Sequence, residues 1–261
     1  MEGFAVLSGT IDKDSVLDKI SNIAATRYTE YKKAHHEWID SVEAGPYRDA
    51  LETMRHNTII LDAVKTKFPN KRIAYVPEAD EVYWSTSPKE ARGSDRALVD
   101  CHYDAPFSII PTAGIIYYRV IVAVNHNNTV TTIFPDEGIR VKMDTGDFHG
   151  LDYNIDLHCV EGSIPPGSYR VLLKLHFLAI PENSSQAHAD FIRWINVNWT
   201  YFSRRVMSAS NDPQNILEYL VGYIVNIVRF LFLHSNIFVM LCLVAASLYF
   251  FSAKARKASK T

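Results

Sequence analysis

The chain has 261 residues, of which 48% are hydrophobic and 21% are charged, and its formal net charge at pH 7 is −2. This composition is typical of a folded globular protein and excludes a disordered or fibrous class. The nearly balanced charge argues against binding nucleic acid through a basic surface, so no nucleic-acid partner is expected. The length accommodates one large domain with additional segments.

The N-terminal sequence lacks the features of an export signal. Residues 1–14 contain no basic start and only a short apolar run, whereas a secretory signal peptide needs a basic start and a longer apolar segment. We therefore expect the main domain to stay on the cytosolic side of any membrane. The sequons at Asn127, Asn183 and Asn198 would then remain unmodified, because glycosylation requires export.

Two helical segments are predicted in the N-terminal part. Apolar residues at helical spacing, with Asp and Ser at the start, predict a helix over residues 13–44. Gly45-Pro46 interrupts it, and a second apolar stripe predicts a helix that reaches about Lys67. Residues 1–70 are therefore expected to form a helical layer.

Residues 71–205 are expected to form a β-rich core. Short runs at residues 73–76 and 81–84 predict strands, and the polar segment 85–96 predicts a loop. Residues 115–124 place mostly aliphatic side chains on both faces of a strand, with one arginine among them. This alternation predicts a core strand with two faces, one carrying Val120 and Val122 and the other carrying Arg119 and Ile121.

The last strand of the core carries several basic side chains on one face. Arg170, Lys174 and His176 share this face with Leu172, and apolar residues occupy the other face. If Arg170 points into the protein, Lys174 and His176 either line a polar pocket or lie at its rim.

The His-x-Asp pattern at His102 and Asp104 is the main candidate for a metal site. On a strand, residues two apart point to the same face, so both side chains can reach one ion. Similar pairs begin at His35 and His188, but only His102 is followed by a strand-rich region with further histidines and a basic residue. Two imidazoles and one carboxylate suit non-haem Fe(II), and the third ligand must come from another strand.

The region around this pair carries a series of motifs. In chain order they are His102-Tyr103-Asp104, an Arg-led apolar strand from Arg119 to Asn125, Thr132-Ile133-Phe134-Pro135, Gly146-Asp147, His158 and Arg170. In order and spacing, this stretch resembles the catalytic core of the 2-oxoglutarate/Fe(II)-dependent dioxygenases, most closely the prolyl 4-hydroxylase-like branch. Two positions depart from that pattern: Asn127-Asn128-Thr129 replaces the usual Gly-Gly, and Leu172 stands where some branches have Ser.

The resemblance implies a double-stranded β-helix, or jelly roll, within an α+β or mostly β fold. It implies that Fe(II) is bound by His102, Asp104 and His158, and that Arg170 pairs with the distal carboxylate of 2-oxoglutarate. A planar guanidinium suits this role because it grips a carboxylate with two parallel hydrogen bonds. O2 is the second co-substrate, and ascorbate is a candidate cofactor.

Other residues near the expected site have open assignments. Tyr117 and Tyr103 are candidates for contacts with the co-substrate, although tyrosine is also common in strand packing. His149 is the alternative third metal ligand. It lies too far before Arg170 for the pattern, so His158 is favoured.

The three cysteines do not predict a disulfide framework. Cys101 and Cys159 flank His102 and His158 in the sequence. If those histidines face the interior, strand alternation turns both thiols outward. We therefore expect two small, outward-packed thiols at these positions.

Residues 206–261 are predicted to be a membrane anchor with a basic tail. Residues 237–253 form an uncharged run that can cross a thin bilayer, such as that of the endoplasmic reticulum. Residues 216–233 are apolar but contain charges, which predicts an interfacial helix; a hairpin with the next segment is the alternative. Membrane lipid is thus an expected partner of a single-pass C-terminal anchor. The aromatic stretch 191–202 fits either a membrane interface or core packing.

Two functions follow from these features. The first is a membrane-anchored 2-oxoglutarate- and Fe(II)-dependent dioxygenase that hydroxylates a protein prolyl side chain or a small molecule. The alternative is a membrane-anchored jelly roll that has lost catalysis and serves in structure or assembly, since jelly rolls also build capsids. A metal-binding cupin would share the ligand types but would leave Arg170 unexplained. The presence of all three ligands together with Arg170 favours the enzyme.

Overall fold

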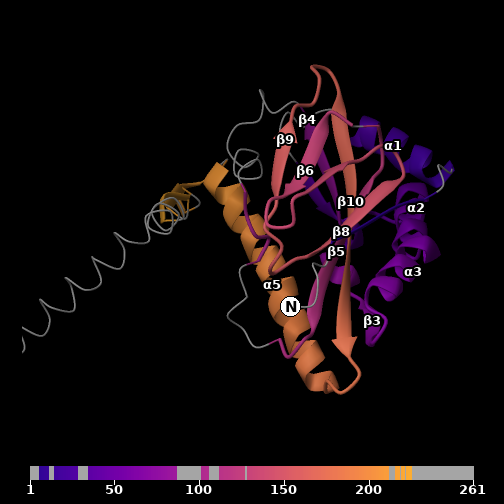
Figure 1. The fold of residues 1–261 in the computed structure, drawn as a ribbon. Helices are drawn as coiled ribbons and strands as arrows, with labels where there is room; N and C mark the ends of the chain where they lie inside the picture. The colour runs from indigo at the N-terminus through magenta and orange to yellow at the C-terminus, as the bar shows by residue number, and fades with distance from the viewer. Residues whose placement is uncertain are drawn as a thin grey trace, which may run out of the picture. The chain divides into compact units, whose positions relative to one another are not determined.

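The computed structural model describes most of the chain (Figure 1). The described residues are 6–11, 15–28, 35–86, 101–105, 112–126, 128–211, 215–217, 219–220 and 222–224. The chain divides into two compact units, residues 1–204 and 205–261. Both β-sheets belong to the first unit.

The larger sheet is antiparallel and has seven strands in the order β1-β8-β5-β10-β4-β2, with β3 paired to β10. Its strands are β1 (Leu7–Thr10), β2 (His35–Trp38), β3 (Lys71–Tyr75), β4 (Glu81–Thr86), β5 (Ile116–Ala123), β8 (Asp147–Asp152) and β10 (Tyr169–Pro181). β10 has 13 residues and pairs with β5 along one edge and with β4 and β3 along the other. The strands predicted at residues 73–76 and 81–84 correspond to β3 and β4.

The smaller sheet has three antiparallel strands in the order β7-β6-β9. They are β6 (Val130–Phe134), β7 (Ile139–Lys142) and β9 (Cys159–Gly162). Phe134 of β6 is buried in one cluster with Ile121 and Leu172 of the larger sheet, so the two sheets share an interior. A larger and a smaller antiparallel sheet around one interior is the arrangement expected of a double-stranded β-helix within an α+β fold.

The two predicted faces of the core strands are present. On β5, Val120 and Val122 pack toward the N-terminal helices, whereas Ile121 and Ala123 pack with Phe134 in the interior between the sheets. We call the face that carries Ile121 and Ala123 the inner face of the larger sheet. By the same alternation, the inner face of β10 carries Leu172 and the basic side chains Arg170, Lys174 and His176.

Three helices cover the outer face of the larger sheet: α1 (Ser15–Arg27), α2 (Pro46–Arg55) and α3 (Thr58–Lys67). Two 3-10 helices, η1 (Ile39–Ser41) and η2 (Pro77–Ala79), precede α2 and β4. Leu17, Leu51 and Val64, one from each α-helix, are fully buried against this face, and each such burial contributes about 1.5–3 kcal/mol. Pro46 starts α2 with a backbone angle that suits the first turn. The Asn57 side chain caps α3 by accepting hydrogen bonds from two backbone N–H groups.

The predicted helix over residues 13–44 is only partly correct. α1 ends at Arg27, and residues 35–38 form β2, which pairs with β4. Arg27 Nε donates a hydrogen bond to Glu37 Oε2 at 3.0 Å, which ties the strand to the end of the helix. Pairing with a distant strand outweighs the local helical pattern. The second predicted helix is divided into α2 and α3, with Asn57 as the cap between them.

The helix α5 (Gln186–Asn211) follows β10 and packs through one face. Ile192 is buried in a cluster with Leu178 of β10, whereas Phe191 and Trp194 are exposed. The aromatic stretch 191–202 therefore contributes to core packing on one side and leaves aromatic side chains exposed on the other.

Within the described residues, no helix is both long and apolar enough to cross a membrane. The predicted transmembrane segment 237–253 lies outside the described residues, as does most of the predicted interfacial helix 216–233. The described residues at 216–217, 219–220 and 222–224 are helical. Membrane anchoring therefore stays a prediction.

Candidate metal centre

His102 and His158 lie opposite each other because their backbones form an isolated antiparallel β-bridge. The His102 N–H donates to the His158 carbonyl oxygen at 2.9 Å, and the reciprocal hydrogen bond is 3.1 Å long. The Ala105 N–H donates to the Tyr153 carbonyl oxygen at 3.1 Å, which holds the rest of segment 101–105 beside the end of β8. Directly opposed residues project to the same face, and the two imidazole centroids are 4.5 Å apart.

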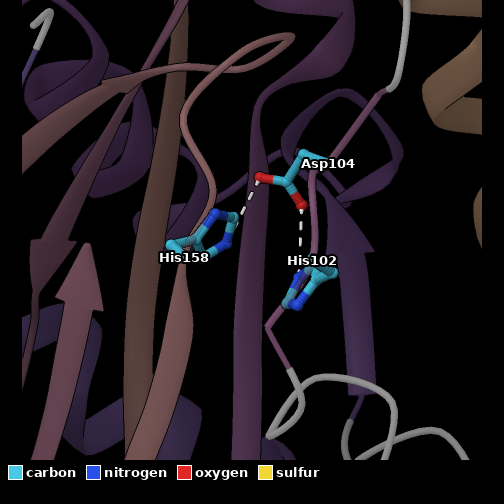
Figure 2. A group of neighbouring side chains, drawn as sticks. All are labelled: His102, Asp104 and His158. Atoms are coloured by element: carbon cyan, nitrogen blue, oxygen red, sulfur yellow. Dashed lines mark ion pairs between the residues drawn. The ribbon is translucent and has the colours of Figure 1, made fainter. Parts of the chain in front are cut away.

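Asp104 completes a cluster of three potential metal ligands (Figure 2). One donor atom from each of His102, Asp104 and His158 lies within 4.8 Å of the other two. His102 Nε2 is 3.9 Å from one carboxylate oxygen of Asp104, and His158 Nε2 is 3.9 Å from the other. Two imidazole nitrogens and one carboxylate oxygen fit a non-haem Fe(II) ion. The structure thus brings together the three residues that the sequence predicted as ligands, although His102 lies in a single bridge and not in a strand.

His158 is oriented by its other ring nitrogen. Its Nδ1 lies 3.2 Å from the backbone carbonyl oxygen of Asp156. Because a carbonyl only accepts hydrogen bonds, Nδ1 carries the proton and Nε2 keeps its lone pair on the side of Asp104. Burial lowers the pKa of His158 to about 4. The ring is therefore neutral at pH 7, which is the form that binds a metal.

The carboxylate of Asp104 is held by Arg119 of β5. Arg119 Nη1 donates to Asp104 Oδ2 at 2.5 Å, and Arg119 Nε donates to His176 Nε2 at 2.9 Å. Burial alone would raise the pKa of Asp104, but the positive charge of Arg119 acts in the opposite direction, and this pKa lies well below its usual range. This partner was not predicted. Its signal in the sequence is a lone charged residue within the apolar strand IYYRVIVA.

A second buried carboxylate neutralises part of the inner face. Glu81 of β4 is fully buried. It forms an ion pair with Lys174 Nζ at 3.0 Å and accepts a hydrogen bond from Arg204 Nη2 at 2.6 Å. His36 Nδ1 lies 3.0 Å from the same carboxylate. Burial lowers the pKa of Lys174 to about 7, despite the opposing charge of Glu81. Lys174 therefore faces the interior, as one of the two sequence interpretations expected, but it is already paired.

Arg170 shares the inner face of β10 and differs from its neighbours. Its side chain is 8% exposed, and its backbone is in register with Ser85 of β4. Within the described part of the chain, its guanidinium makes no hydrogen bond or ion pair. Burial lowers the pKa of Arg170, and only Tyr83 opposes this effect. A buried cation without an anion is unfavourable, so the position suits the carboxylate of a bound molecule.

His149 of β8 is buried on the inner face, in register with Ile121 of β5. It is fully buried, and its ring centroid is 5.8 Å from that of Phe134, which is 6.1 Å from that of His158. Burial lowers the pKa of His149 to about 3, and the positive charge of Arg170 acts in the same direction. These side chains therefore share one interior. His149 Nδ1 lies 3.0 Å from Met143 Sδ, and His149 is not part of the three-residue cluster.

The two tyrosines predicted near the site occupy different environments. Tyr117 is fully buried on the inner face of β5, with its ring 5.2 Å from that of Tyr153 and 5.6 Å from that of His176. Its hydroxyl has no hydrogen-bond partner within the described structure. Tyr103 is 44% exposed. Of these two tyrosines, Tyr117 lies among the inner-face residues and Tyr103 does not.

Cys101 and Cys159 form a disulfide bond, with their Cα atoms 4.1 Å apart. This corrects the expectation of two free thiols. Strand alternation indicates that both cysteine side chains project from the backbone on the side opposite the imidazoles. It does not indicate how far apart the two cysteines are. The backbone bridge between His102 and His158 supplies that distance, because it brings the neighbouring cysteines side by side.

No family model and no curated protein matches the chain. Among solved structures, it matches 2-oxoglutarate/Fe(II) dioxygenases, prolyl 4-hydroxylases among them, over about 70% of its length.

Three of these structures illustrate the similarity. The viral collagen prolyl hydroxylase of Paramecium bursaria Chlorella virus-1, in its 2-oxoglutarate complex, is 11% identical, with 69% of this chain and 98% of that chain covered and a TM-score of 0.45. A prolyl 4-hydroxylase from Pseudomonas putida is 12% identical, with 68% of this chain and 93% of that chain covered and a TM-score of 0.41. The α-ketoglutarate-dependent epimerase SnoN from nogalamycin biosynthesis is 12% identical, with 70% of this chain and 83% of that chain covered and a TM-score of 0.47.

Proposed function

We propose that the protein is a 2-oxoglutarate- and Fe(II)-dependent dioxygenase. In this proposal His102, Asp104 and His158 hold the metal, and Arg170 binds the distal carboxylate of 2-oxoglutarate. Bound Fe(II) supplies the O2 activation that couples decarboxylation of 2-oxoglutarate to oxidation of a second substrate.

The observation that carries the proposal concerns three basic side chains on the inner face. Two of them have a carboxylate partner and the third does not. Arg119 is paired with Asp104, and Lys174 is paired with Glu81. Arg170 is buried and has no ionic partner within the described residues. A dicarboxylate that reaches from the metal ligands toward β10 would supply the missing anion, and a guanidinium binds a carboxylate with two parallel hydrogen bonds.

The surrounding residues prepare this interior for the reaction. His158 is neutral and aims Nε2 at the cluster, while Arg119 keeps Asp104 ionised. Phe134 and Leu172 contribute to an apolar wall between the sheets, which excludes water and strengthens the electrostatic interactions within.

The substrate and the location rest on the sequence. We propose hydroxylation of a protein prolyl side chain or a small molecule, with ascorbate as a candidate for maintaining the reduced metal. The apolar run 237–253 supports attachment to a membrane through a C-terminal anchor, with lipid as the partner. The alternative, a jelly roll that has lost catalysis, predicts that the cluster binds no metal.

The decisive experiment separates the metal site from the carboxylate site. In Mn(II)-loaded, anaerobic full-length protein, Arg170→Gln should weaken 2-oxoglutarate binding by about 30-fold or more, because the carboxylate loses a buried charged partner worth about 2 kcal/mol or more. The Mn(II) affinity should stay unchanged, and His158→Ala should reduce it strongly. Isothermal titration measures both affinities, and succinate formation with Fe(II) and O2 reports turnover.

Two exposed residues provide matched controls. Arg140 pairs with Glu161 at the surface, and His126 pairs with Asp144; Arg140→Gln and His126→Ala should leave both affinities unchanged. Equal 2-oxoglutarate affinity in wild type and Arg170→Gln would exclude the proposed role of Arg170. Failure of the wild-type protein to bind metal would favour the structural alternative.

A further inference from the structure

The Cys101–Cys159 disulfide lies directly beside the two histidines of the candidate metal centre. Cys101 precedes His102, and Cys159 follows His158. In an antiparallel pair, the residue before one partner faces the residue after the other. The disulfide therefore connects the two backbones next to the histidine bridge, on the face opposite the imidazoles.

The segment that carries two of the three ligands lies outside the regular strands of both sheets. Residues 101–105 contain one isolated β-bridge and no strand. Their backbone hydrogen bonds within the described structure include the pair between His102 and His158, the bond from the Ala105 N–H to Tyr153, and the bond from the Trp199 indole N–H to the Asp104 carbonyl oxygen. By contrast, β5 and β10 are in register over eight residue pairs. The disulfide is thus a covalent link between the segment holding His102 and the strand next to His158.

We infer that this disulfide is a positioning element of the metal site, and the inference rests on the metal-binding part of the proposed function. In the oxidised protein, the disulfide holds His102 and Asp104 against His158. After reduction, the segment keeps its noncovalent contacts through the His102–His158 bridge, Asp104 and Ala105 but loses the covalent link beside His102. The reduced protein should therefore bind the metal more weakly while keeping its fold, since α1, α2, α3 and the larger sheet do not depend on this link.

The bond can be reduced in the folded protein. Cys101 is exposed and Cys159 is 8% exposed, so a reagent can approach from the side of Cys101. A water-soluble trialkylphosphine donates two electrons to the disulfide and takes the oxygen of one water molecule. The products are two thiols and one phosphine oxide, which balances atoms and electrons.

Metal titration of the full-length protein in both redox states tests the inference. Peptide mapping first establishes the Cys101–Cys159 cross-link, and Mn(II) then serves as the probe after the phosphine has been removed under argon. We expect reduction to raise the Mn(II) dissociation constant about tenfold or more, comparable to the loss of groups that orient metal ligands. Reoxidation should restore the affinity, and circular dichroism should stay unchanged throughout.

Serine substitutions provide the matched controls. The double variant Cys101→Ser/Cys159→Ser should bind Mn(II) as weakly as the reduced wild type and should not respond to phosphine. Cys242→Ser, which changes the third cysteine of the chain, should behave as wild type in both states.

Several results would overturn the inference. They are free thiols at Cys101 and Cys159 in the native protein, equal Mn(II) affinity in both redox states, or unfolding on reduction, which would assign the bond to stability alone. Equal affinities would leave the proposed dioxygenase function intact. Absence of Mn(II) binding by the oxidised wild type would instead overturn the metal site and the inference together.

Discussion

At the scale of single residues, Asp104 stands at one end of a line of buried charges. Arg119 contacts both Asp104 and His176. The backbone N–H of His176 donates to Asp80 Oδ1 at 2.8 Å, and Arg55 Nε donates to Asp80 Oδ2 at 2.9 Å. Each charge along this line has a partner of opposite sign or a hydrogen bond, as buried charges require. The orientation of the carboxylate ligand therefore depends on side chains from β5, β10 and α2.

Asp152 should make stability depend on pH. It is 5% exposed, and burial raises its pKa to about 7, whereas an aspartate in an unfolded chain titrates near about 3.9. Between about pH 4 and 7, the folded protein keeps a proton that the unfolded chain has released, so the free energy of unfolding should fall as pH rises. Asp152→Asn keeps the oxygen that accepts from the Asn154 N–H and should flatten this slope in urea unfolding.

A surface aspartate provides the comparison for this prediction. The Asp62 carboxylate is 70% exposed, so Asp62→Asn should reproduce the wild-type slope. The contribution of Asp152 approaches about 1.4 kcal/mol per pH unit at its steepest. Parallel pH profiles for wild type and Asp152→Asn would show that this carboxyl does not titrate as described.

The sequence anticipates some of these residues better than others. His102, Asp104 and His158 are predictable because their types and spacing match a known ligand pattern, and the inner-face position of Lys174 follows from alternation along a strand. The pairing of Cys101 with Cys159 and of Arg119 with Asp104 depends on distances between separate segments. Alternation and composition carry no information about such distances, so these contacts emerge only from the fold.

At the scale of elements, the cap of α3 offers a local test of helix stability. Asn57 Oδ1 accepts hydrogen bonds from the Ile59 and Ile60 N–H groups at 3.0 and 3.2 Å. Asn57→Ala removes this cap and should lower the free energy of unfolding by about 1 kcal/mol, while Asn57→Asp should keep most of the stability. Chemical denaturation measures both. Mn(II) affinity should not change, because α3 packs on the outer face; a parallel loss of metal binding would contradict this separation.

The same part of the chain shows where local patterns are insufficient. Periodicity predicts helical structure where α1, α2 and α3 lie, although it merges α2 and α3 into one helix. It fails at residues 35–38, where the chain forms β2 because the backbone groups of β4 are available for pairing. A strand at the edge of a sheet is specified by its neighbour, and that neighbour lies far away in the sequence.

At the scale of the whole molecule, the proposed anchor should be separable from the first unit. Both sheets and all candidate ligands precede residue 205. Deletion from Asn215 onward should therefore move the protein from the membrane fraction to the soluble fraction and leave Mn(II) affinity unchanged. A transmembrane helix satisfies its own backbone hydrogen bonds and needs no support from the sheets. Recovery of the full-length chain in the soluble fraction would contradict the anchor.

The compartment of the first unit can be measured at Asn198. The expected cytosolic location leaves its sequon unmodified, whereas the disulfide favours an oxidising compartment, in which glycosylation takes place. The Asn198 side chain lies exposed on α5 and is accessible to modification. A glycan that is lost in Asn198→Gln would place the domain on the lumenal side; a bare Asn198 in membrane-bound protein would support the cytosolic location.

The central position of β10 has a consequence for the synthesis of this protein. β3, β4 and β5 all form hydrogen bonds with β10, and a ribosome delivers β10 after all of them. Until then, these strands expose unpaired edges, which are prone to pairing with other chains. Arg170 also lies on β10, so the proposed carboxylate site cannot form before this strand emerges. Nascent chains that stall before Tyr169 should therefore be targets for chaperones, and premature termination there should yield aggregates in place of a smaller working enzyme.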